Sequence, residues 1–372
     1  MRTTKKIIAL SAALVIAAAL GSCAWMITRD PQAGAKSSQR FHNPYTIAED
    51  SGERVPWTYF FRRAWVQMTR DLAQTDVPPT IPLDIAAMQR SDFAVAWLGH
   101  ASLLVRAGDL WVLVDPVFSN TAGPIQGLGP ARLTPLPFSD GELPHIDVVL
   151  ISHDHFDHLD LTTVKAISQQ AGGAPVFFAG TGLGDWFASQ VGRRATEFSW
   201  WHETRVGDTD FQFVPAQHNS GRSAFHKNTS LWGGWVIRRA GKQLYFPGDT
   251  AFVAELFSDI RQRVGAIDVA ALPIGAYEPR RLMRFEHLDP GEALHAHHIL
   301  QPSSSIGVHW GTFQLGDEEP FQPAADLSVA TASNAQASGF GLVPIGGFIA
   351  VDSQRGDHFH APKDLRPVSA KR

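Results

Sequence analysis

The chain of 372 residues contains a single cysteine, Cys23, and little charge for its length. One cysteine excludes any structural disulfide bond within the chain. Charged residues make up 18% of the sequence and the net charge is −4, with a pI near 6.5. Proteins that bind nucleic acids usually present a basic surface, so this balance argues against a nucleic-acid partner.

Apolar residues, in contrast, are plentiful. They make up 44% of the chain and include 11 tryptophans, enough to bury a large core. Without its flanks the chain has about 260 residues, the upper end of the size of one domain. We therefore expect one domain over residues 91–352, with a tether and a helical extension before it over residues 24–90. A polar tail over residues 353–372 is expected to follow, with His358 and His360 in solvent.

The first 23 residues have the features of a bacterial secretory signal. Three basic residues precede the apolar run Ile7–Leu20, and two small residues precede Cys23. The stretch Leu20–Cys23 resembles a lipobox, in which the cysteine is lipidated and becomes the first mature residue. The alternative is an uncleaved anchor, because residues 24–27 extend the run to about 20 residues, enough to span a bilayer. Either arrangement predicts a membrane-anchored protein of the bacterial cell envelope, outside the cytoplasm.

Two different segments separate this terminus from the domain. Residues 28–55 are polar and contain Pro, Ser and Gly, which predicts an irregular tether. The segment Trp57–Leu72 interleaves aromatic residues with arginines and, as a helix, places Phe61, Trp65 and Met68 on one face. That face either lies in a lipid surface or packs on the domain, and we prefer the packed helix.

The most informative feature is the six-residue turn His153–His158, which reads HDHFDH. The run Ile146–Ser152 before it is short, apolar and β-branched, which predicts a buried strand. Open α/β sheets place their functional sites at the carboxyl ends of strands. Three imidazoles and two carboxylates that leave one strand end together outline a site for two metal ions.

Three later candidate ligands follow apolar strands in the same way. They are His218 after Phe211–Gln217, Asp249 after Leu244–Gly248, and His309 after Ser304–Val308. A hydrolytic zinc ion needs about three protein ligands and an open position. Unrelated histidines on solvated loops do not explain four strands that each end in a candidate ligand. Two further strands are predicted near the start of the domain, at Phe93–Leu98 and Asp109–Val114.

These residues resemble the signature of the metallo-β-lactamase-fold hydrolases, a His-x-His-x-Asp-His turn followed by a distant His, an Asp and a final His. Further motifs make the chain similar to the N-acyl-phosphatidylethanolamine phospholipase D-like proteins, over about residues 93–352. They are Trp97–Ser102, Asp115–Ser119, Pro215–His218, Leu231–Trp235, Pro273–Arg280, His287–Pro290 and His309–Phe313. The resemblance implies an α/β fold, the αββα four-layer sandwich of the metallo-β-lactamases.

The resemblance also implies two zinc ions, although iron or manganese suits the same nitrogen and oxygen ligands. Asp249 would bridge both ions, opposite a bridging hydroxide. The remaining ligands are His153, His155 and His218 for one ion, and Asp157, His158 and His309 for the other.

The implied reaction is hydrolysis of a membrane phospholipid to a phosphatidic acid and an N-acylethanolamine, by attack of the metal-bridging hydroxide on phosphorus. Asp249, His287 and Asp157 are the expected catalytic residues. Asp249 would hold the nucleophile, and His287 would donate a hydrogen bond near the phosphate or protonate the leaving oxygen. His100 is expected to approach the ligands as a supporting donor, and Asp154 to orient a ligand imidazole.

Glu286 departs from the pattern, because the animal enzymes that carry this motif have Gln before the histidine. A carboxylate there repels an anionic phosphodiester unless Arg280, Arg281 or Arg284 pairs with it. Another ester, a lactone, a thioester or a cyclic phosphodiester is therefore an alternative substrate. A non-catalytic metal-binding lipoprotein is a second alternative, although such a module needs no open coordination position. The sequence gives no indication of the oligomeric state.

Two other features are open to a structural or a functional interpretation. The histidines of Pro290–Leu300 fall in a predicted helix and are interpreted as packed or solvated, not as a further metal site. They are His295, His297 and His298. The Gly- and Pro-rich segment Phe118–Pro137 is predicted to be a long loop. Its apolar residues either line a groove near the metal site or lie on a plain surface loop. They are Phe118, Ile125, Leu128 and Leu133.

Overall fold

The computed structural model describes residues 40–47, 75–223, 226–332, 339–352, 356–360, 366 and 368–369. The predicted signal peptide with Cys23, most of the predicted tether, and the helix predicted over Trp57–Leu72 lie outside the described residues. So does most of the tail. Within the described part of the chain, no helix is long and apolar enough to cross a bilayer.

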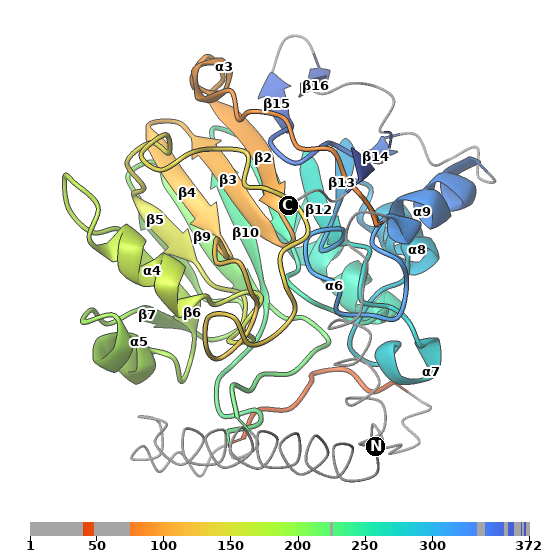
Figure 1. Ribbon diagram of the computed structural model, residues 1–372, viewed down its shortest axis with the longest axis horizontal. Helices are drawn as coiled ribbons and strands as arrows, with labels where there is room; N and C mark the ends of the chain where they lie inside the picture. Colours follow the sequence, from red (N-terminus) through yellow and green to blue (C-terminus); the bar gives the residue numbers. More distant parts are fainter. Residues whose placement is uncertain are drawn as a thin grey trace, which may run out of the picture.

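Two mixed sheets lie face to face, with helices on both outer sides (Figure 1). The first sheet has the strand order β16-β15-β2-β3-β4-β5-β6-β7. Its strands are β2 (Phe93–Gly99), β3 (Ser102–Ala107), β4 (Leu110–Val114), β5 (Val148–Leu150), β6 (Val176–Gly180), β7 (Thr196–Phe198), β15 (Phe348–Asp352) and β16 (Gly356–His360).

The second sheet has the order β14-β13-β12-β11-β10-β9-β8. Its strands are β8 (Glu203–Val206), β9 (Thr209–Val214), β10 (Gly234–Arg239), β11 (Lys242–Phe246), β12 (Val269–Pro273), β13 (Ser304–Val308) and β14 (Phe340–Gly341). A separate pair joins β1 (Asp76–Val77) to β17 (Val368–Ser369).

Strand β2 shows why the predicted strands are apolar along their whole length. Side chains alternate between the faces of a strand, and β2 is buried at every position. Phe93, Val95 and Trp97 point into the core between the two sheets. The intervening Ala94 and Ala96 face the helices on the outer side of the first sheet. Burial on both faces requires a continuous apolar run.

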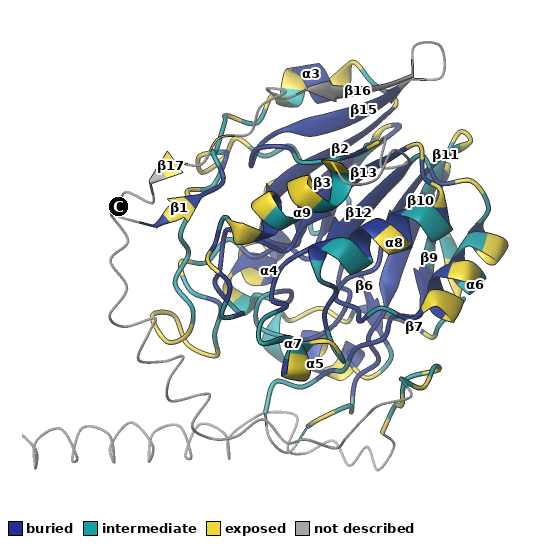
Figure 2. Cartoon of the chain, turned by 90° about the vertical axis from the view of Figure 1, so that its right-hand side faces the viewer, coloured by how far each residue is buried: buried dark blue, intermediate teal, exposed yellow. Residues whose placement is uncertain are grey.

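The helices complete four layers. Three of them pack their apolar residues on the outer face of the first sheet, and three pack on the second. The former are α3 (Ile85–Gln89), α4 (Leu161–Ser168) and α5 (Gly184–Gln190), and the latter are α6 (Ala254–Val264), α8 (Pro290–Leu300) and α9 (Gln322–Ala332). Helices such as α6 and α9 carry exposed residues on their outer faces, while central strands such as β2 and β12 are buried (Figure 2). The αββα sandwich predicted from the sequence is confirmed.

The topology brings the predicted ligands to one edge of the sandwich. Strand β5 pairs in parallel with β4, and β11, β12 and β13 pair in parallel with one another. The carboxyl ends of β5, β11 and β13 are followed by His153–His158, Asp249 and His309. A short helix near this edge, α7 (Arg280–Met283), leads to His287, and Asp289 caps α8 through a capping box with Glu292.

The predicted loop Phe118–Pro137 contains only two isolated β-bridges, Thr121 to Ala131 and Ile125 to Leu128. A groove of about 680 Å³ lies between the chain around this loop and α4, and of the four apolar residues named above only Phe118 lines it. Ile125 and Leu128 are 39% and 47% exposed. Of the two alternatives, the plain surface loop therefore holds for Ile125 and Leu128, and the groove for Phe118.

Candidate metal centre

Three imidazoles from two different loops meet in what we call the first donor set, His153, His155 and His218. His155 Nδ1 lies 2.9 Å from His153 Nε2 and 3.2 Å from His218 Nε2. Burial lowers the pKa of both His153 and His218 well below the ordinary value. Ring nitrogens that converge in this way can offer lone pairs to one ion.

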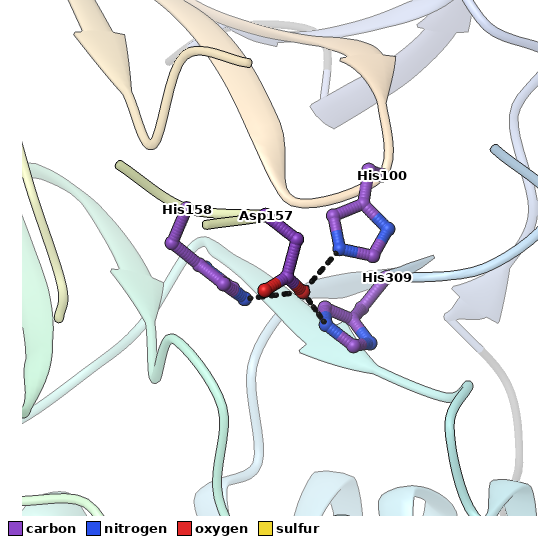
Figure 3. Close-up of side chains that lie close together, drawn as sticks. All are labelled: His100, Asp157, His158 and His309. Atoms are coloured by element: carbon purple, nitrogen blue, oxygen red, sulfur yellow. Dashed lines mark hydrogen bonds and ion pairs between the residues drawn. The ribbon is translucent and has the colours of Figure 1, made fainter. Parts of the chain in front are cut away.

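The second donor set consists of His100, Asp157, His158 and His309 (Figure 3). All three imidazoles direct a ring nitrogen at Asp157 Oδ2, at 2.9 Å for His100 and 3.4 Å for both His158 and His309. His100 joins the three predicted ligands of this site, in the supporting position that the sequence predicts. Burial, reinforced by His309, lowers the pKa of His100 to about 3.

Asp249 lies between the two sets. Its Oδ2 is 3.1 Å from His158 Nε2 and 3.8 Å from His218 Nε2, and its Oδ1 is 3.1 Å from His309 Nε2. The preceding Gly248 has φ +67, and a Cβ there would lie 2.7 Å from the Cβ of Ser152. A glycine is therefore needed for the chain after β11 to come this close to the ligand turn. The carboxylate of Asp249 therefore faces histidines of both donor sets.

Burial and neighbouring charges shift the pKa values of the carboxylates and of two histidines of the centre in opposite directions. Burial alone would raise the pKa of Asp157 and Asp249, but His158 and other neighbouring histidines lower both well below the ordinary value. Burial opposes protonation of His158 and His309, yet the carboxylates raise the pKa of His158 well above normal and that of His309 to about 9. Asp249 Oδ1 and His309 Nε2 are buried without a well-aligned hydrogen bond. A cation at these atoms would satisfy them, so the residues fit a metal site.

In two of the ligand imidazoles, the ring nitrogen that faces away from the centre has a hydrogen-bond partner. This partner determines which ring nitrogen carries the proton. Ser152 donates its hydroxyl proton to Asp115 Oδ2, so Ser152 Oγ accepts from His153 Nδ1, 2.9 Å away. His218 Nδ1 lies 2.9 Å from the carbonyl oxygen of Glu286, which can only accept. In both imidazoles Nε2 is then left with a lone pair toward the centre. Partners of this kind orient metal ligands in proteins.

Asp115 supports the second set in the same way, although the sequence did not indicate this role. Its Oδ2 lies 2.7 Å from His158 Nδ1, and its Oδ1 accepts from the Ser152 N–H at 2.7 Å. The available signal was its place directly after β4, the parallel neighbour of β5. Asp115, His100 and His309 also adopt φ of 42°, 51° and 63°. Such conformations are strained for residues other than glycine and are concentrated at functional sites.

The prediction that Asp154 orients a ligand imidazole is wrong. Its Oδ1 accepts from the Gly221 N–H at 2.6 Å and its Oδ2 from the Ser230 hydroxyl at 2.8 Å. Arg222 in turn donates to the carbonyl oxygens of Asp154 and Leu159, at 2.7 and 2.8 Å. The side chain of Asp154 points away from its histidine neighbours, and with Arg222 it ties the ligand turn to the loop that follows His218.

His287 faces the centre, as predicted. It is buried, its ring lies against His218 and His309 with centroids 5.3 and 5.6 Å away, and its Nδ1 is 3.8 Å from Asp249 Oδ2 with no hydrogen-bond partner. Burial lowers the pKa of His287 to about 4. An unpaired buried nitrogen beside the ligands is available to a substrate oxygen.

Glu286 has a neutral partner. Its Oε1 accepts from Asn219 Nδ2 at 2.7 Å. Arg280, one of the three arginines considered as a partner, instead lies 3.3 Å from Asp289 and donates to Glu292 at 2.5 Å. Arg280 therefore does not pair with Glu286.

The histidines of α8 pack or face solvent, as predicted. His297 is buried, with Nδ1 2.8 Å from Ser305 Oγ. His295 is exposed and His298 is half-buried. None of the three belongs to either donor set.

Comparison with known proteins places this site in a family. Residues 110–310 match the model of the beta-lactamase superfamily domain. The N-acyl-phosphatidylethanolamine-hydrolyzing phospholipase D 1 of Caenorhabditis elegans is 36% identical over 307 residues, which cover 78% of this chain and 86% of that protein.

Solved structures agree on the fold. A possible metal-dependent hydrolase from Veillonella parvula superposes with a TM-score of 0.56 at 15% identity, over 69% of this chain and 99% of that one. A metallo hydrolase from Ignicoccus hospitalis gives a TM-score of 0.50 at 20% identity, over 74% and 98%. The chain is thus a metal-dependent hydrolase and belongs to the metallo-β-lactamase-fold family, among the N-acyl-phosphatidylethanolamine phospholipase D-like proteins.

Proposed function

We propose that the protein is a zinc-dependent phosphodiesterase that cleaves membrane phospholipids as a phospholipase D does. The observation that carries this proposal is the pair of donor sets joined by Asp249, with the unpaired His287 Nδ1 beside them. Imidazole and carboxylate ligands suit zinc. The name of the Caenorhabditis elegans relative supports a phosphodiester substrate with a lipid on both sides of the headgroup.

Two zinc ions held by the donor sets would supply Lewis acidity and lower the pKa of a bound water toward 7. The residues of the chain supply the rest. Asp249 Oδ1 would accept a hydrogen bond from the attacking water and keep it aimed at phosphorus. His287 would donate from Nδ1 to an oxygen of the phosphodiester as negative charge develops there. Asp157 would stay fixed as a ligand through its 2.9 Å contact with His100.

The proposed site of action is the membrane of the bacterial cell envelope. The features that support it are the apolar run Ile7–Leu20 and Cys23 in a lipobox-like sequence. A lipid anchor keeps an enzyme at the surface that contains its substrate, which raises the local substrate concentration.

Glu286 favours a second candidate, hydrolysis of an uncharged ester or lactone on the same centre. Its carboxylate lies one residue from His287 and accepts a hydrogen bond from the uncharged amide of Asn219. A negative charge at this place disfavours an anionic phosphodiester more than a neutral ester.

Hydrolysis of N-acyl-phosphatidylethanolamine by the full chain in mixed detergent micelles tests the proposal. The protein is first stripped of metal by chelation, and the reaction is followed by mass spectrometry with and without added zinc. Uncharged lactones and thioesters are assayed in parallel, and the Asp249→Ala variant serves as the blank for contaminating enzymes.

Zinc-dependent release of N-acylethanolamine by the wild type alone would support the phospholipase D reaction. Release of N-acylethanolamine that persists after chelation would contradict the claim that the reaction depends on the metal centre. Zinc binding together with turnover of lactones only would move the assignment to the second candidate.

A further inference from the structure

A short N-terminal segment lies against the loop that carries His218, more than 170 residues later in the chain. Residues 40–47 run beside this loop, below the body of the sandwich in Figure 1. Phe41, Tyr45 and Ile47 pack against the main core. Phe41 N–H donates to the carbonyl oxygen of Asn228 at 2.9 Å, and Tyr45 donates its hydroxyl proton to Asp259 Oδ2 at 2.9 Å. The sequence placed this segment in the tether, and the structure shows it in contact with the hydrolase domain.

Asn43, in the middle of the segment, pairs with both backbone polar groups of one residue, His218. Asn43 Nδ2 donates to the His218 carbonyl oxygen at 2.9 Å, and the His218 N–H donates back to Asn43 Oδ1 at 3.1 Å. Trp232 Nε1 donates to the same Oδ1 at 3.0 Å. The side-chain amide thus forms the two hydrogen bonds that a neighbouring strand would form with His218, at a point beyond the end of β9.

This contact matters because His218 is the one member of the first donor set that is distant from the ligand turn. Its ring is oriented by the Glu286 carbonyl oxygen. Its backbone is buried, and the residue before it is held from the other side by Thr250 Oγ1, which accepts from the Gln217 N–H at 3.0 Å. Removal of the Asn43 amide would leave a buried N–H and a buried C=O unpaired at the ligand itself. The main chain of His218 would then be free to shift, and its Nε2 would leave the position that meets His155.

We propose that Asn43 is a positioning residue of the metal centre, which makes residues 40–47 part of the site. Asn43 touches neither substrate nor metal and acts through the backbone of His218. The inference rests on the proposed function, because it takes His218 as a ligand of the first ion. His218 belongs to the first donor set and to a group with Asp249 and His287, but not to the second donor set, so the effect should fall on one of two ions.

The test compares Asn43→Ala with Tyr45→Phe in the full chain in detergent. Tyr45→Phe is the matched control, because it removes a hydrogen bond of the same segment to Asp259 without touching His218. Zinc content is measured by mass spectrometry after dialysis, zinc affinity by competition with a chromophoric chelator, and folding by circular dichroism and thermal unfolding. A general loss of stability would weaken the binding of both ions, so the loss of one ion alone reports the positioning role of Asn43.

The wild type and Tyr45→Phe are expected to bind two zinc ions, and Asn43→Ala to keep one of them with wild-type affinity. The affinity for the other should fall about 10- to 100-fold, the range typical of lost support behind a metal ligand. If Asn43→Ala does not fold, Asn43→Asp replaces it. The aspartate retains an acceptor for the His218 N–H but replaces the donor to its carbonyl oxygen by a second acceptor, and a selective loss of the same ion is expected.

Three results would overturn the assignment of Asn43. They are two ions bound with wild-type affinity by the Asn43 variant, equal weakening of both ions, and the same loss in Tyr45→Phe. A folded wild-type chain that binds no zinc would instead refute the metal centre, and the role of Asn43 with it. The two failures are therefore distinguishable.

Discussion

The two donor sets lie side by side but are held together by different forces. The second set contains its own carboxylate, Asp157, and two histidines whose pKa is raised by Asp157 and Asp249. Attraction between Asp157 and its three imidazole neighbours, at 2.9 to 3.4 Å, therefore acts within the second set itself. The first set has only imidazoles, and burial lowers the pKa of His153 and His218 well below the ordinary value. The members of the first set meet only at His155 Nδ1, through contacts of 2.9 and 3.2 Å, so their positions depend more on groups outside the set.

The supports of the two sets reflect this difference. His158 is backed by a buried carboxylate, Asp115. The first set is backed by uncharged groups, which are Ser152 Oγ behind His153, the Glu286 carbonyl oxygen behind His218 and the Asn43 amide along its backbone. One half of the centre is thus organised by charge pairs and the other by hydrogen bonds from distant segments. The first half should be the more sensitive to changes elsewhere in the chain.

The largest effect is expected at Asp249, the residue that both sets share. Asp249→Ala removes several kcal/mol of charge stabilisation, so turnover should fall at least about 10³-fold, with weakened binding of both ions. His155→Ala should abolish turnover as well, yet weaken only one ion. Turnover and zinc content are measured on variants whose circular dichroism matches the wild type. Full activity of either variant would remove the metal centre from the reaction.

A smaller loss is expected at His287, which lies beside both sets and is assigned to neither as a ligand. His287→Ala should lower kcat about 10²- to 10³-fold, the effect of losing one positioned donor to a developing charge, with two zinc ions retained. His295→Ala, on the exposed face of α8, is the control. Loss of a zinc ion together with kcat would identify His287 as a ligand and contradict its role as a donor to substrate.

Asp115→Asn tests whether the second donor set depends on charge while the first depends on hydrogen bonds from distant segments. The amide retains an oxygen for the Ser152 N–H but removes the charge behind His158. The affinity for the ion held by His158 should fall about 10- to 100-fold. The other ion should be weakened less, because Asp115 reaches the first donor set only through the Ser152 hydroxyl, which accepts from His153. Chelator competition on this variant and on Asn43→Ala should reveal losses at different ions, and the double variant should lose both. Uniform weakening by Asp115→Asn alone would show that the two halves are not independent.

The sequence predicted the ligands because each of them follows an apolar strand. Burial on both faces makes β2, β5, β11 and β13 readable as apolar runs, and a polar residue directly after such a run stands out. The parallel pairing of β11, β12 and β13 then brings the ends together without further information. The αββα fold follows from the same runs and from the family motifs.

The supports were not predictable in the same way. Asp154 was assigned wrongly because neighbouring residues of a turn point to different sides, and only the course of the chain shows that its carboxylate meets Gly221 and Ser230. Asn43 lies 175 residues from His218, and no local pattern marks an asparagine that completes a distant loop. Ligand identity is a local property of this sequence, whereas ligand orientation depends on tertiary contacts.

The smallest effect is expected at Glu286, because its backbone carbonyl oxygen and its side chain have different partners. Its carbonyl oxygen supports His218 and is present in any residue, while its side chain contacts Asn219. Glu286→Gln retains an acceptor for Asn219, so zinc content and affinity should not change. Removal of the carboxylate charge should lower KM for an anionic phosphodiester by about two- to fivefold, since a solvent-accessible charge interaction is worth about 0.2–1 kcal/mol. KM for an uncharged ester should stay the same. A loss of zinc in this variant would show that the side chain, and not only the backbone, holds the first donor set.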